Sequence, residues 1–76
     1  AAQEALRLVQ QYVPEARIQA YVYTGQIGST RSHAIVLPNG EWMNAGLLLD
    51  SYYHQGRGVD SNSDAMLKAE IAQLTS

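Results

Sequence analysis

The stretch from Thr24 to His33 gathers the side chains that are best suited to chemistry. It reads TGQIGSTRSH and combines hydroxyl groups, an arginine and a histidine with two glycines. A phosphate-binding loop needs the pattern GxxxxGK[ST] between a strand and a helix, so that backbone N–H groups surround the phosphate. No lysine follows the second glycine here, and the next residues alternate like a strand. The stretch therefore predicts the bend of a β-hairpin, in which glycine supplies a positive φ.

Nucleophilic catalysis would need a hydroxyl group, a base and an orienting carboxylate within reach of one another. Ser32 and His33 are neighbours in a predicted strand, so their side chains point to opposite faces. Asp50 and His54 stand four residues apart on a predicted helix, where a solvated surface pair is the simpler interpretation. We therefore expect no enzyme and no catalytic residue.

Residues 60–64, DSNSD, have the spacing that opens a calcium-binding loop. Such a loop also needs glycine at its sixth position and glutamate at its twelfth. Those positions hold Ala65 and Ile71, and capping of a helix explains the acidic and hydroxyl residues equally well. Two histidines without cysteine are a poor basis for a zinc site. The sequence thus predicts neither a metal nor a cofactor.

Charge and length restrict the remaining functions. The 76-residue chain has a net charge of −2, with five scattered Lys and Arg residues against seven Asp and Glu residues. Surfaces that bind phosphate gain their affinity from clustered basic side chains, so nucleic acid and acidic membranes are disfavoured as partners. No stretch is long and apolar enough to span a bilayer. The length indicates one domain, residues 1–76, and the absence of cysteine leaves the compartment undecided.

Hydrophobic periodicity predicts the elements that position these residues. Apolar residues at helical spacing precede Pro14, which disfavours helical geometry at the residue before it. Alternating residues with β-branched and aromatic side chains then indicate strands. The expected fold is a small α+β domain made of a helix, a three-stranded antiparallel meander and two helices. The ranges are a helix over 2–13, strands over 17–24, 31–37 and roughly 41–43, and helices over 45–55 and 64–74.

The segment LPNGE determines how the third strand pairs. Pro38 has no N–H to give to the flanking pair of a two-residue hairpin. We therefore expect a type I turn with Pro38 and Asn39 at its centre, followed by Gly40 in a left-handed bulge. A shift of one residue would move Trp42 to the other face of the sheet.

The order of helix, three strands and helix is similar to that of the double-stranded-RNA-binding fold. That family carries a basic cluster at the start of its final helix, where this chain has the acidic sequence DSNSDAML. The predicted helix over 45–55 also interrupts the match. The resemblance is therefore one of topology, and it implies no binding of RNA.

Tyrosines on the sheet are the best candidates for a binding surface. If helices cover the face with Ile18, Ala20 and Val22, then Tyr21 and Tyr23 lie on the open face. We expect the histidine of the second strand to lie nearby, with its arginine two residues along the same face. Exposed aromatic residues with arginine are typical of protein interfaces. The predicted partner-binding residues are Tyr21, Tyr23, Arg31, His33 and Trp42.

These features predict a small non-enzymatic protein–protein interaction module, an adaptor, inhibitor or regulatory domain that acts through an aromatic sheet face. One alternative is single-stranded nucleic-acid binding, with bases stacked on Tyr21 and Tyr23 and with Arg17 and Arg31 nearby. Another is an enzyme that uses a histidine. A homodimer through a free sheet edge is a further expectation. The sequence names neither the partner nor the compartment.

Overall fold

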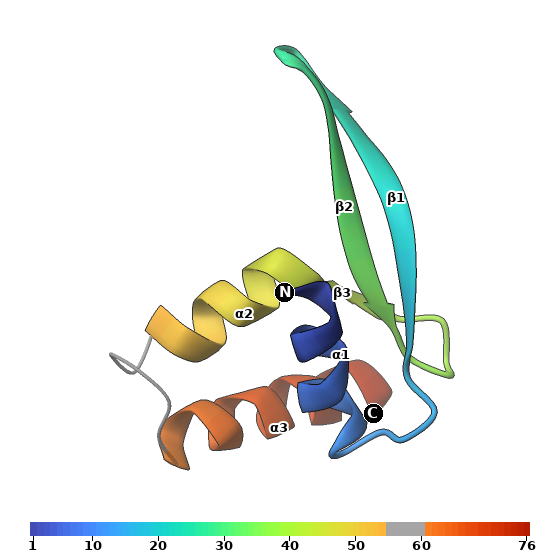
Figure 1. The fold of residues 1–76 in the computed structure, drawn as a ribbon. Helices are drawn as coiled ribbons and strands as arrows, with labels where there is room; N and C mark the ends of the chain where they lie inside the picture. Colours follow the sequence, from blue (N-terminus) through green and yellow to red (C-terminus); the bar gives the residue numbers. More distant parts are fainter. Residues whose placement is uncertain (55–60) are drawn as a thin grey trace.

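A computed structural model describes residues 1–54 and 61–76 of the chain (Figure 1). Its three strands form one antiparallel sheet in the order β1-β2-β3. The predicted α+β class is therefore confirmed, with one helix before the meander and two after it. Among the described residues, no helix has the length and apolar character needed to cross a membrane. The elements are α1 (Ala2–Gln10), β1 (Arg17–Gly25), β2 (Gly28–Val36), β3 (Trp42–Asn44), α2 (Ala45–His54) and α3 (Ser61–Thr75).

The first two strands are longer than the sequence predicts. Pairing continues to Gly25 and Gly28, so that only Gln26 and Ile27 lie between the strands. Gly28 has a φ of 123°, which glycine adopts without steric cost. The bend lies where the sequence places it, but the loop predicted over 25–30 is wrong. Hydroxyl-bearing residues of that stretch extend the ladder instead.

The turn between β2 and β3 confirms the expectation for LPNGE. The Gly40 N–H donates to the Leu37 carbonyl at 2.9 Å, which places Pro38 and Asn39 at the centre of the turn. Gly40 has a φ of 91°, as its left-handed role requires. The Asn39 side chain also donates to the Leu74 carbonyl at 2.8 Å, and this bond ties the turn to the end of α3.

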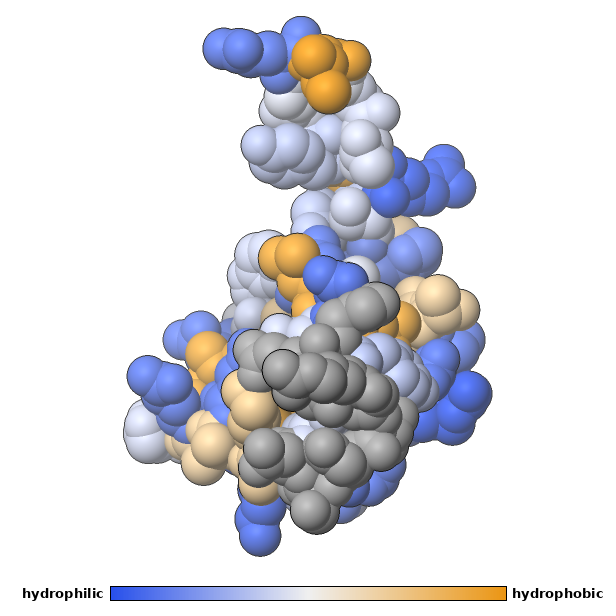
Figure 2. Space-filling view, turned by 90° about the vertical axis from the view of Figure 1, so that its left-hand side faces the viewer, coloured by the Kyte–Doolittle hydropathy of each residue, from blue (hydrophilic) through white to orange (hydrophobic). Residues whose placement is uncertain are grey.

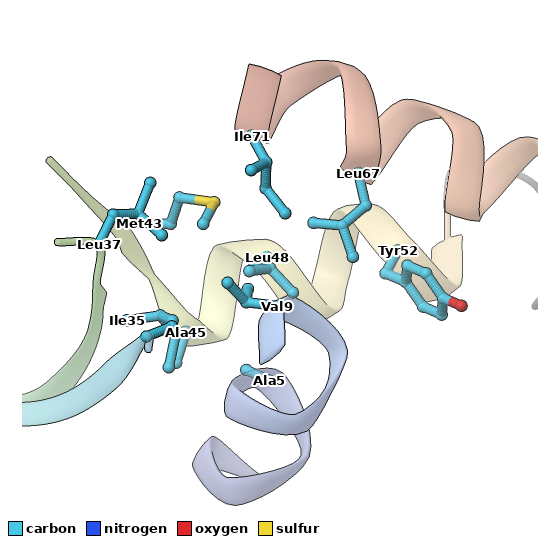
Figure 3. Close-up of a cluster of buried hydrophobic side chains, with 11 residues drawn as sticks. Ala5, Val9, Ile35, Leu37, Met43, Ala45, Leu48, Tyr52, Leu67 and Ile71 are labelled. Atoms are coloured by element: carbon cyan, nitrogen blue, oxygen red, sulfur yellow. The ribbon is translucent and has the colours of Figure 1, made fainter. Parts of the chain in front are cut away.

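The helices build the hydrophobic core against the base of the sheet (Figure 3). Helix α2 packs against both α1 and α3, and Asn44 caps its first turn by accepting a hydrogen bond from the Leu47 N–H at 2.8 Å. Ile35 of the central strand and Val9 of α1 are fully buried. The other buried hydrophobic core residues are Ala5, Ala16, Leu37, Met43, Ala45, Leu48, Tyr52, Leu67 and Ile71.

The outer part of the hairpin, residues 20–33, projects beyond the helices, and we call it the hairpin arm (Figure 1). Val22 and Tyr23 are neighbours that point to opposite faces, yet they are 62% and 63% exposed. Ile18, nearer the base, packs against the core as expected. The expectation that helices cover Val22 is wrong, because the strands extend further than the helices reach.

Candidate functional site

The register of the hairpin separates the predicted binding residues onto two faces. In an antiparallel pair, residues directly opposite each other project to the same face. Because two residues form the turn, odd-numbered residues of β1 stand opposite even-numbered residues of β2. Arg31 and His33 therefore lie on the face opposite to Tyr21 and Tyr23, and the prediction of one shared patch is wrong for them. The deciding pairs are Ala20 with His33, Tyr21 with Ser32, Val22 with Arg31 and Tyr23 with Thr30.

Tyr21 and Trp42 are brought together by the same register. Trp42 pairs with Val36, which places it on the face of the tyrosines. The rings of Tyr21 and Trp42 meet edge to face, with centroids 5.6 Å apart and planes at 69°. Asn44 holds the tyrosine in place by donating from Nδ2 to the Tyr21 hydroxyl at 2.6 Å. We call Tyr21, Tyr23 and Trp42 the aromatic face.

A pocket of about 320 Å³ lies against this ring pair, and we call it the aromatic pocket. Its walls come from all three strands and from the turn at Gly40. Ala34 of the central strand, which lies between the two strands that carry the rings, contributes only a methyl group to the lining. No lining residue is charged. The lining residues are Gln19, Tyr21, Ala34, Val36, Gly40 and Trp42.

Sequence reasoning identified Tyr21 and Trp42 but missed the other residues of this pocket. Gln19 alternates with the tyrosines along β1, so its position on their face was readable from the sequence. Ala34 and Val36 reach the same face only through the register of the hairpin. The signal that would have found them is the even number of residues between the two strands, which sets odd-numbered residues of β1 opposite even-numbered residues of β2.

Arg31 and His33 line a separate pocket of about 210 Å³, together with the starts of α1 and α2. This pocket has no acidic lining residue. The charge of the arginine adds to the partial positive charge of the helix N-termini. The pocket therefore suits a negatively charged group better than a positively charged one.

Two buried or half-buried tyrosines of α2 connect the helices. The Tyr52 hydroxyl donates to Asp64 Oδ1 of α3 at 2.8 Å, and this bond, with burial, raises the pKa of Tyr52 to about 12. The Tyr53 hydroxyl donates to the Glu4 carboxylate of α1, which raises the pKa of Tyr53. Both bonds are made by protonated phenols within the helical body. They stabilise the fold rather than form part of the aromatic face.

The catalytic and metal candidates are only partly described. Ser32 and His33 occupy consecutive positions of β2, so their side chains leave opposite faces of the sheet. The side chain of His54 and residues 55–60 lie outside the described residues, as therefore do the Asp50–His54 pair and the start of DSNSD. Within the described residues, no group of three or more His, Asp or Glu side chains is placed to hold a metal ion.

Replacing Asn44 with alanine removes two hydrogen bonds, one that caps α2 and one that holds Tyr21. We expect the free energy of unfolding to fall by about 1–2 kcal/mol, measured by urea denaturation. Asn44→Asp is the matched control, since its carboxylate still caps the helix but cannot donate to the tyrosine. It should retain most of the stability, and equal losses in both variants would contradict the capping role.

Comparison of the chain with protein-family models, with curated proteins and with solved structures gave no match.

Proposed function

We propose that this chain is a small non-enzymatic protein–protein interaction module that binds its partner through the aromatic face. The observation that carries the proposal is the set of exposed hydrophobic side chains on the hairpin arm and on the neighbouring strand β3. Ile27 at the turn is fully exposed, Tyr23 is 63% exposed and Trp42 is 52% exposed. Hydrophobic atoms at the end of the arm lie beside hydrophilic ones (Figure 2). Exposed apolar groups framed by polar ones are typical of interaction sites.

The backbone of the arm supports the same function. A two-stranded hairpin is marginally stable by itself, so a partner that adds contacts would stabilise it. Among the described residues, strand β3 pairs only with residues 34–36 of β2, and β1 has no second neighbour in the sheet. Both edges of the arm therefore expose N–H and C=O groups to which an extended segment can bind. A second copy of this chain is one such partner.

Tyr23 and Val22 allow a controlled test of the proposal. They are adjacent and almost equally exposed, but only Tyr23 belongs to the aromatic face. In a pull-down from lysate of the source organism, we expect the change Tyr21→Ser with Tyr23→Ser to reduce the captured partner at least tenfold. Loss of a central aromatic contact of an interface commonly has this effect. Val22→Ser should leave capture unchanged.

A folding control and one further outcome complete this test. Circular dichroism of each variant must match the parent spectrum, and Tyr23→Ser alone serves if the double variant is misfolded, because Tyr23 makes no contact with the core cluster. Equal capture by the parent chain and by a folded Tyr23→Ser variant would refute the aromatic face as the binding surface.

Single-stranded nucleic-acid binding is the second candidate, and the charge distribution favours it. Residues 16–40 contain Arg17 and Arg31 but no acidic residue. The register weakens this candidate, because Arg31 lies across the sheet from the tyrosines on which bases would stack. Fluorescence anisotropy with a labelled oligonucleotide at low salt tests it, and the absence of binding there would exclude it.

A further inference from the structure

The aromatic pocket has the chemistry of a site for proline. We propose that it binds a proline-rich segment of the partner in the polyproline II conformation, with an acidic residue near one end of that segment. This inference rests on the proposed function and names the class of ligand.

The two rings offer surfaces that suit a proline ring. Tyr21 and Trp42 stand at 69° to each other, so they form two walls rather than one flat platform. Ala34 lies on the strand between them and is buried, while Trp42 is 52% exposed and offers its ring to a ligand. Grooves lined by aromatic rings bind proline-rich segments because the polyproline II helix is already extended and loses little conformational entropy. The hydroxyl bond to Asn44 keeps the tyrosine wall in position before any ligand binds.

The pocket offers hydrogen-bond donors where a proline-rich segment offers acceptors. The Tyr21 hydroxyl accepts a bond from Asn44, and its own proton has no acceptor among the described residues. The Trp42 indole carries an N–H, and the Gln19 amide carries two more hydrogens at the rim. Proline residues have carbonyl oxygens but no N–H. The donors of this pocket therefore match the carbonyl oxygens of a proline-rich segment.

Arg17 gives the site its charge preference. It stands opposite Val36, and Val36 stands opposite Trp42, so the three residues form one row across the aromatic side of the sheet. Arg17 is exposed, and no other strand residue on this side is charged. The four residues from Arg17 to Tyr21 span about 13 Å of strand, or about four residues of polyproline II helix. An acidic residue within about four positions of the bound proline would meet this arginine.

The single tryptophan makes the test direct, because Trp42 is the only such residue in the chain and lies in the pocket. The probe is the peptide acetyl-Asp-(Pro)6-Asp-amide. We expect a saturable change in Trp42 emission and in the NMR signal of its indole N–H. The peptide acetyl-Asp-(Ala-Gly)3-Asp-amide, of equal length and charge, should bind at least tenfold more weakly. Equal binding of the two peptides would overturn the preference for proline.

Variants assign the response to individual residues. Tyr21→Ala should abolish binding, followed through the indole N–H signal. Gln19→Glu should also weaken binding, and it changes an exposed position of the pocket that is not in the core. Arg17→Gln should weaken binding of the acidic peptide about three-fold and leave acetyl-(Pro)6-amide unaffected, as is usual for one exposed ion pair. Val22→Ser on the other face should have no effect. Unchanged binding in both pocket variants would overturn the proposed site.

The outcome also separates this inference from the proposed function. If millimolar proline peptide leaves the indole signal unchanged while partner capture still requires Tyr23 but not Val22, the preference for proline is wrong and the interaction module stands. If capture is also insensitive to Tyr23, both are wrong.

Discussion

Replacement of Ile35 by alanine is expected to lower the free energy of unfolding by about 2–5 kcal/mol. Ile35 lies on the central strand, has no exposed surface and belongs to the cluster in which the sheet meets the helices (Figure 3). A domain of 76 residues has a total stability of about 4–11 kcal/mol at ordinary values per residue. Loss of this one side chain therefore removes a large share of the stability, because the rigid core cannot close the cavity that remains.

Urea denaturation followed by Trp42 fluorescence measures this loss. Val22→Ala is the matched control, since Val22 is a β-branched residue of the same hairpin but is 62% exposed. Its replacement should change the free energy of unfolding by no more than about 0.5 kcal/mol. Equal effects at the two positions would mean that the core does not lie at the base of the sheet.

Stability is expected to fall between pH 10 and pH 12 because of Tyr52. Its phenol donates to Asp64, and that bond and burial raise the pKa of Tyr52 in the folded chain from 10.0 to about 12. The folded state therefore holds this proton more tightly than the unfolded state does. The resulting stabilisation is fully present below pH 10 and is lost as the pH rises to about 12. It amounts to at most about 3 kcal/mol for a shift of about two pKa units.

The comparison of the parent chain with Tyr52→Phe isolates this contribution from the other tyrosines. The difference in free energy of unfolding should be constant below pH 10 and should shrink above it. Asp64→Asn should reduce the same pH dependence, because the negative charge of Asp64 no longer disfavours ionisation of the phenol while its burial remains. A difference that stays constant up to pH 12 would contradict the assignment of the bond between Tyr52 and Asp64.

Local chemistry allowed the sequence to predict the turn at Gly40. That turn depends on residues close together in the chain, among them a proline without an N–H. The hairpin bend is different, because its length depends on how far two strands continue to pair. The prediction ended the strands too early. The faces assigned to Arg31 and His33 were a separate error, because the predicted six-residue loop, like the observed two-residue turn, sets odd-numbered residues of β1 opposite even-numbered residues of β2.

The candidate site was predictable in its residue types but not in its shape. Tyr21 and Trp42 are aromatic residues on predicted strands, and each could be proposed as a binding residue separately. Their contact depends on the pairing of β3 with β2, which brings residues from both outer strands together over Ala34. The exposure of Val22 depends on helix length relative to strand length, and periodicity along the chain carries no information about that ratio.

The length of the projecting hairpin can change without a change in the hydrophobic core that stabilises the domain. Gln26 and Ile27 form the turn far from the helices, so residues can be added there without altering the core (Figure 1). Two extra residues in each strand would lengthen the arm by about 7 Å and return its end to the same face. One extra residue in each strand would lengthen it by half as much and turn the end to the other face. Arms that present the same face to a partner therefore differ in length by steps of two residues in each strand.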